Sequence, residues 1–75
     1  MKDQLITWQN EDEAVITQWF FSSGDTVQEG DVVCEVTLEK TVVDIVATVS
    51  GELKILAEED TEIGTDDPIC AISPN

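Results

Sequence analysis

The 75-residue chain has no histidine, no arginine and only three lysines, against 17 Asp and Glu residues. The absence of histidine excludes histidine-based catalysis and histidine-ligated metals. The formal net charge of −14 disfavours nucleic acid, because phosphate binding needs clustered basic residues, and it disfavours anionic membrane surfaces for the same reason. No stretch of about 18 apolar residues occurs, so we expect no membrane span.

Cysteine is scarce as well, and two residues do not make a disulfide framework. Cys34 and Cys70 each lie in an apolar run, which predicts two buried, reduced thiols; a Cys34–Cys70 bridge is the alternative. The first residues lack the features of a signal or transit peptide, so we expect an intracellular protein, cytoplasmic or, in a eukaryote, in the mitochondrial matrix. The length predicts one small domain, residues 1–75. Such a domain buries about 60% of its unfolded surface and offers little scaffold for a catalytic pocket.

What the chain does contain is strand-forming sequence. Val, Ile and Thr recur in short runs between turn signals, and no helical stripe is evident. The predicted strands are residues 4–8, 13–20, 26–27, 31–37, 42–47, 51–56, 62–63 and 68–72. Their spacing predicts an all-β sandwich or flattened barrel.

A weak internal repeat suggests two similar halves related by a pseudo-two-fold axis. The segments that recur, with one residue of slippage, are Asp25-Thr26, Gly30 and the Cys34 run, matched with Asp60-Thr61, Gly64 and the Cys70 run. Because Glu59-Asp60 stands where the first half has Gly24-Asp25, we expect the backbone of that turn to differ.

The run from residue 32 to residue 49 must fold back on itself. As one strand it would measure about 60 Å, about twice the roughly 30 Å width of a globule of this size. Side-chain parity places Glu39 and Lys40 at the turn, which puts the apolar residues of both arms on one face. The predicted pairs are Val36 with Val43, Cys34 with Ile45, Val32 with Ala47 and, at a cost in like charge, Glu35 with Asp44.

This register predicts a hairpin that presents Lys40 at its tip. We expect the two sheets to pack around Ile16, Val32, Val36, Val43, Ile45 and Ile72, with the strands near Leu5 and Ile69 adjacent at the opposite end. The aromatic residues Trp8, Trp19, Phe20 and Phe21 are expected in the core or between strands. Strand parity requires one of the two phenylalanines to face outward.

An exposed lysine is usually only a solvated charge, but the sequence around Lys40 is specific. Residues 24–45 hold a Gly-Asp-x-Val-x-x-Gly-Asp run, an apolar-Glu-apolar strand and an acidic residue before the lysine. This pattern resembles the lipoyl domains of 2-oxo acid dehydrogenase complexes, within the biotinyl/lipoyl-attachment family. The resemblance extends to residues 16–19, Gly51 and residues 64–72, and so covers nearly the whole chain. The family commonly has Asp-Lys-Ala where this chain has Glu39-Lys40-Thr41, so we expect modification with an altered ligase preference.

The resemblance implies a barrel-sandwich hybrid of two four-stranded sheets and a carrier rather than an enzyme. Lipoate would be attached to Lys40 by a lipoate ligase or lipoyl transferase. A thiamine-dependent 2-oxo acid decarboxylase would then acylate it, an acyltransferase core would pass the acyl group to coenzyme A, and a dihydrolipoyl dehydrogenase would reoxidise it. Partner selectivity is expected from surface residues near the tip: Glu39, Glu35, Asp44, Glu11, Asp12 and Glu13.

Three alternatives compete with this interpretation. A biotinyl or glycine-cleavage-type carrier could use the same fold, as could an unmodified structural hairpin module; the methionines that typically flank a biotinyl lysine are absent here. The acidic segment 60–67 suggests a calcium loop, but the sixth and twelfth residues from Asp60 are Thr65 and Ala71 instead of Gly and Glu. We therefore expect no metal site.

Overall fold

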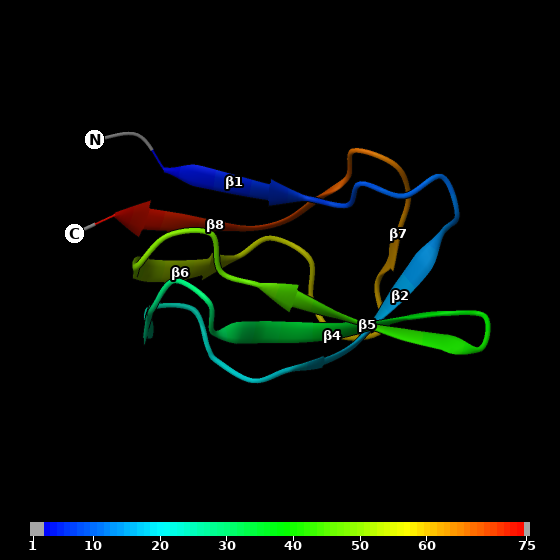
Figure 1. The fold of residues 1–75 in the computed structure, drawn as a ribbon, viewed down its shortest axis with the longest axis horizontal. Coiled ribbons are helices and arrows are strands. Elements are labelled where there is room, and N and C mark those ends of the chain that lie inside the picture. Colours follow the sequence, from blue (N-terminus) through cyan, green and yellow to red (C-terminus); the bar gives the residue numbers. More distant parts are fainter. Residues whose placement is uncertain (1–2, 75) are drawn as a thin grey trace.

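The computed structural model describes residues 3–74, which form eight β-strands (Figure 1). They lie in two antiparallel sheets, with strand orders β1-β8-β6-β3 and β5-β4-β2-β7, that are not closed into a barrel. The strands are β1 (Gln4–Thr7), β2 (Ala14–Trp19), β3 (Thr26–Val27), β4 (Val32–Leu38), β5 (Thr41–Val46), β6 (Gly51–Ile55), β7 (Glu62–Ile63) and β8 (Pro68–Pro74).

The predicted all-β class and flattened sandwich of two four-stranded sheets are therefore confirmed, and each predicted strand is found within two residues of its expected bounds. Residues 3–74 contain no helix long and apolar enough to cross a membrane.

The two sheets are copies of one pattern, which confirms the predicted pseudo-two-fold symmetry. Replacing β1, β8, β6 and β3 by β5, β4, β2 and β7 converts one strand order into the other. The registers agree as well: Cys34 of β4 lies opposite Ile45, just as Cys70 of β8 lies opposite Ile6. The same irregularity follows in both pairs, since Val32 lies opposite Val46 and Pro68 lies opposite Thr7.

The halves differ by one residue outside the recurring segments, in β2. The pairing of β2 with β4 shifts between Ile16 and Gln18, so Thr17 is an extra residue in β2. Its counterpart strand β6 pairs with β8 without such a shift. The Thr17 hydroxyl lies 2.6 Å from the Thr37 hydroxyl on the neighbouring strand, which ties the bulge to β4.

The turns correct the alignment of the repeat and remove the expected slippage, because Gly24, Gly30 and Cys34 each match the residue 36 positions later. Gly24 and Asp60 occupy equivalent positions, because their N–H groups donate to the carbonyls of Leu53 and Ile16, each at 2.8 Å. Both have positive φ, 96° for the glycine and 67° for the aspartate. The expected difference in backbone conformation is therefore wrong, since aspartate is among the few residues that tolerate this region.

The second pair of turns also corrects the alignment of the two halves. Gly30 matches Asp66, not Gly64: the two have φ of 94° and 68°, and their N–H groups donate to the carbonyls of Ala47 and Trp8. Gly64 instead matches Gln28. Each of these N–H groups donates to the carboxylate three residues later, on Asp67 at 2.8 Å and on Asp31 at 2.9 Å.

The β4–β5 hairpin has the predicted turn and, near the tip, the predicted register. Val36 lies opposite Val43, Cys34 opposite Ile45 and Glu35 opposite Asp44. The predicted pairing of Val32 with Ala47 is wrong, because a bulge at Val33 moves Val32 opposite Val46.

The bulge also changes which valine enters the core. Val33 is fully buried, whereas Val32 is only half-buried. The other expected core residues behave as predicted: Ile16, Val36 and Ile72 are fully buried, and Val43 and Ile45 are partly buried against the core.

Aromatic residues and thiols complete the interior. Trp8 is buried, Trp19 and Phe21 pack against the core, and Phe20 is the outward-facing phenylalanine that parity requires. Cys34 and Cys70 are both free and fully buried, as the sequence predicts for reduced thiols. Burial raises the pKa of Cys34 to about 12, with a further contribution from Cys70, whose own pKa burial raises to about 11.

Candidate modification site

The β4–β5 turn lies at one end of the long axis of the molecule, which measures 35 Å against 20 and 18 Å for the other two axes. Figure 1 shows the two chain ends at the opposite end of that axis, where β1 and β8 are neighbours. The predicted separation of Lys40 from the terminal strands is therefore confirmed.

Lys40 is the second residue of a two-residue turn. Leu38 and Thr41 are the last paired residues, and Glu39 and Lys40 between them are both exposed. Glu39 has a φ of 43°, and a positive φ at the first central position is what hairpin turns of this length require. The usual Asn or Gly is absent, so the turn follows from the pairing of the arms and not from local turn chemistry.

Two rigid arms support this turn. The inner-face residues Val36 and Val43 lie opposite each other, and Leu38 packs against the core at the last paired position. The lysine side chain consequently stands on a turn whose base is fixed by buried contacts. A modifying enzyme can enclose an amine held in this way.

Of the six predicted recognition residues, Glu35 and Asp44 lie opposite each other in the hairpin, further from the tip than Glu39. Glu35 is half-buried and Asp44 is exposed. The like-charge pair predicted from parity is therefore present on the outer face of the sheet.

The other three predicted residues, Glu11, Asp12 and Glu13, lie in the loop between β1 and β2, and all are exposed. The buried Trp8 fixes this loop, because its indole N–H donates to the carbonyl of Asp12 at 2.8 Å. The Asp12 N–H in turn donates to the Asn10 side-chain oxygen at 2.9 Å. The Thr65 hydroxyl donates to the Asn10 carbonyl at 2.7 Å, which ties the loop to the 64–67 turn.

This ordered loop lies beside the hairpin tip. A groove of about 270 Å³ separates the two, lined on one side by Asn10 and Asp12. On the hairpin side it is lined by Leu38, Glu39, Lys40, Thr41 and Val43. The structure therefore brings Asp12 and Glu39 to the same groove as the lysine.

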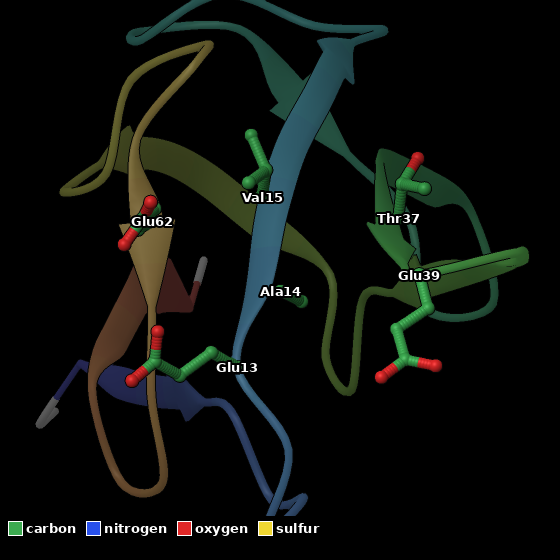
Figure 2. Close-up of a pocket in the computed structure, with 6 residues that line it drawn as sticks. All are labelled: Glu13, Ala14, Val15, Thr37, Glu39 and Glu62. Carbon is green, nitrogen blue, oxygen red and sulfur yellow. The ribbon is translucent and has the colours of Figure 1, made fainter.

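A second groove, of about 220 Å³, shares Glu39 with the first and is lined by Glu13, Ala14, Val15, Thr37, Glu39 and Glu62 (Figure 2). Its three glutamates come from the 9–13 loop, the hairpin turn and β7. The sequence pattern does not predict Glu62 at this groove, because its position there depends on the pairing of Val15 with Glu62 between two strands distant in sequence. Glu11 lines neither groove.

The acidic residues of segment 60–67 stabilise its turns and are not arranged as a calcium-binding loop. Asp60 and Asp66 take the left-handed turn positions, and the Asp67 carboxylate accepts the Gly64 N–H. Within residues 3–74, no group of three or more Cys, Asp and Glu side chains is placed to hold a metal ion.

Comparison with known proteins identifies the family of the chain. The model of the Biotin_lipoyl family, described as "Biotin-requiring enzyme", matches residues 9–72. The chain belongs to this biotin/lipoyl-attachment family.

The chain is also 41% identical, over 61 residues, to a protein of Staphylococcus aureus (strain N315) and to one of Staphylococcus epidermidis (strain ATCC 12228). Both are named dihydrolipoyllysine-residue acetyltransferase component of pyruvate dehydrogenase complex. The match covers 80% of this chain but only 14% of each relative.

Proposed function

We propose that residues 1–75 form a lipoyl carrier domain, with lipoate attached through an amide to the ε-amine of Lys40. The observation that carries this proposal is the exposed lysine at a two-residue turn between two core-anchored strands. Family membership and the similarity to a dihydrolipoyllysine-residue acetyltransferase support it.

The residues at the tip fit such a group. The amine stands on an exposed turn, and the adjoining groove includes the apolar side chains of Leu38 and Val43. When bound, the group supplies a dithiolane that accepts an acyl group and carries reducing equivalents. The chain itself supplies the rigid turn that presents the amine and the carboxylate surface around it.

We further propose that the domain serves the enzymes of a 2-oxo acid dehydrogenase complex as a carrier, not as a catalyst. Attachment removes the charge of Lys40, so the formal net charge goes from −14 to −15. A surface with this excess of carboxylates steers encounter with partners that have basic entrances. The decarboxylase, the acyltransferase core and the dihydrolipoyl dehydrogenase are the proposed partners.

The direct test is the intact mass of the protein after incubation with a lipoate ligase and lipoate. We expect one lipoyl group on the protein and none on Lys40→Arg. Lys54→Arg is the matched control, because Lys54 is also exposed but lies within β6; it should be modified like the parent. A lipoyl group on the Lys40→Arg variant would overturn the assignment of the site.

Geometry can be tested separately from reach. In the double variant Glu39→Lys/Lys40→Glu the same two residue types are kept, so stability should change by no more than about 0.5 kcal/mol. The amine moves to the position with a φ of 43° and points differently. We expect modification to fall sharply, and equal modification of both proteins would show that hairpin geometry is not what the ligase recognises.

Biotin is the second candidate, because the matching family model is described by a biotin requirement. Lys40 has Glu39 and Thr41 as neighbours in place of the methionines that typically flank a biotinyl lysine. Incubation with a biotin ligase should therefore leave the mass unchanged. A biotin adduct on Lys40, with no lipoyl adduct, would replace the lipoyl proposal.

A further inference from the structure

The groove beside Lys40 is the second feature of the hairpin tip. It is bounded by the ordered 9–13 loop on one side and by the hairpin on the other, and its volume is about 270 Å³. Its apolar members, Leu38 and Val43, are half-buried: each packs against the core and leaves part of its side chain exposed. The groove therefore combines polar walls with apolar surface that is still in contact with water.

We propose that this groove is a resting site for the lipoyl chain attached to Lys40. The occupant is specified by the geometry, because Lys40 itself lines the groove. Any group on its amine is tethered at the edge of the cavity. This inference rests on the proposed function, and it assigns to the domain a binding role beyond presenting the lysine.

The chemistry of the lipoyl chain matches that of the groove. A lipoyl chain is a run of methylenes that ends in a dithiolane, so it gains by covering the exposed parts of Leu38 and Val43. A short flexible tether gives an effective concentration in the millimolar range. A groove with only weak intrinsic affinity would thus be occupied for much of the time, and a partner enzyme could still draw the arm out.

The walls of the groove do not need to form on binding. The Trp8 indole and the Asn10 side chain hold the Asp12 backbone at 2.8 and 2.9 Å, and the Thr65 hydroxyl holds Asn10. A site that is already ordered loses less conformational entropy when it takes up a ligand.

The test uses methyl NMR on three samples whose masses are checked first: unmodified, Lys40-acetylated and Lys40-lipoylated protein. We expect the Leu38 and Val43 methyl resonances to shift in the lipoylated sample only, with nuclear Overhauser contacts to the lipoyl methylenes. The Val42 and Val46 methyls should not respond, because these valines are 55% and 42% exposed and alternate with Val43 along β5.

A pair of variants completes the test. Val43→Thr should weaken the contacts to the lipoyl chain by about fourfold, the value of one buried methyl-sized group. Val42→Thr is the matched control on the other face of β5 and should leave them unchanged. Neither change should alter the extent of lipoylation.

The outcomes separate the two proposals. If the mass shows lipoylation but the shifts stay within residues 39–41 and match those of the acetylated sample, the resting site is overturned and the carrier function stands. If the ligase leaves Lys40 unmodified, the carrier function fails and the resting site fails with it.

Discussion

The two halves of the molecule share their hydrogen-bond pattern but not the residues at their left-handed turn positions. Where the first half has Gly24 and Gly30 at left-handed positions, the second has Asp60 and Asp66 with the same positive φ and equivalent backbone partners. What is repeated is thus the path of the backbone. Glycine is one residue that allows this path and aspartate is another.

The halves differ most in how an equivalent pair of neighbouring strands is connected. β4 continues into β5 through the turn that presents Lys40, whereas the equivalent strands β8 and β1 pair but have no turn between them and lie next to the chain ends. The same antiparallel arrangement therefore forms the hairpin that presents Lys40 at one end of the molecule. At the other end it consists of the first and last strands.

The largest expected difference between the halves concerns Gly51 and Ala14, which lie opposite the equivalent residues Val27 and Ile63. A Cβ on Gly51 would lie 2.1 Å from the Ser73 carbonyl oxygen. Gly51→Ala should therefore cost about 3 kcal/mol of unfolding free energy, and Ala14→Gly only about 1 kcal/mol. Urea unfolding followed by tryptophan fluorescence measures both, and equal losses would show that β6 can shift away from β8.

The buried thiols should make stability fall at alkaline pH. In the unfolded chain each thiol has a pKa near 9.0, whereas burial raises the folded values to about 12 for Cys34 and about 11 for Cys70. The unfolded state therefore loses protons first, so stability is unaffected below pH 9 and declines above it. At pH 10 the loss should be about 1.4 kcal/mol for each thiol.

Single variants test whether the two equivalent positions act alike. Cys34→Ala and Cys70→Ala should each halve the slope of unfolding free energy between pH 9 and 10, and the double variant should abolish the contribution of the thiols. A slope that survives in the double variant would assign the alkaline loss to other groups.

Substitutions at the left-handed turn positions should change stability less, and in opposite directions in the two halves. No atom lies within 4 Å of a Cβ placed on Gly24, so Gly24→Ala should cost only the backbone term of about 1 kcal/mol. Asp60→Gly should gain about 0.5 kcal/mol at the equivalent position. Thermal unfolding of both variants gives the comparison, and a loss of stability in Asp60→Gly would indicate that the aspartate side chain contributes more than its backbone strain costs.

The smallest expected effect is on the rate of encounter with partner enzymes. Its test compares charge changes at the two ends of the molecule. Neutralising Glu11, Asp12 and Glu13 as amides should slow reductive acylation a few-fold and flatten its salt dependence, because exposed charges act within a Debye length of about 8 Å. The control neutralises three other exposed carboxylates toward the opposite end, near the first and last strands: Asp3, Glu29 and Glu52. Equal slowing in both variants would assign the effect to net charge and not to the loop.

Much of this fold could be predicted because it rests on local patterns. Strand periodicity located the strands, and side-chain parity placed the turn at Glu39 and Lys40 without any turn residue to mark it. The bulge at Val33 was not predicted, since Val32 and Val33 are equally apolar and parity alone cannot show which one is extra. Glycine positions alone do not align the repeat, because aspartate occupies two of the four equivalent left-handed positions.

The site was less predictable than the fold. The position of Lys40 followed from register, but the groove beside it depends on the 9–13 loop, whose shape is set by the buried Trp8 and by Thr65 from a distant turn. Contacts between residues this far apart in the chain leave no periodic signal. The approach of Glu62 to Glu13 and Glu39 is of the same kind.

The matching strand orders also mean that the two ends of the molecule are interchangeable in principle. Because β8 and β1 are antiparallel neighbours in the same relation as β4 and β5, a circular permutant closed between β8 and β1 and opened between Glu39 and Lys40 would keep both sheets intact. Its new hairpin would form where the chain ends now lie, and its new termini would lie where the lysine now stands. The proposed place of attachment therefore depends on how the strands are connected, because the framework has an equivalent pair of strands at each end.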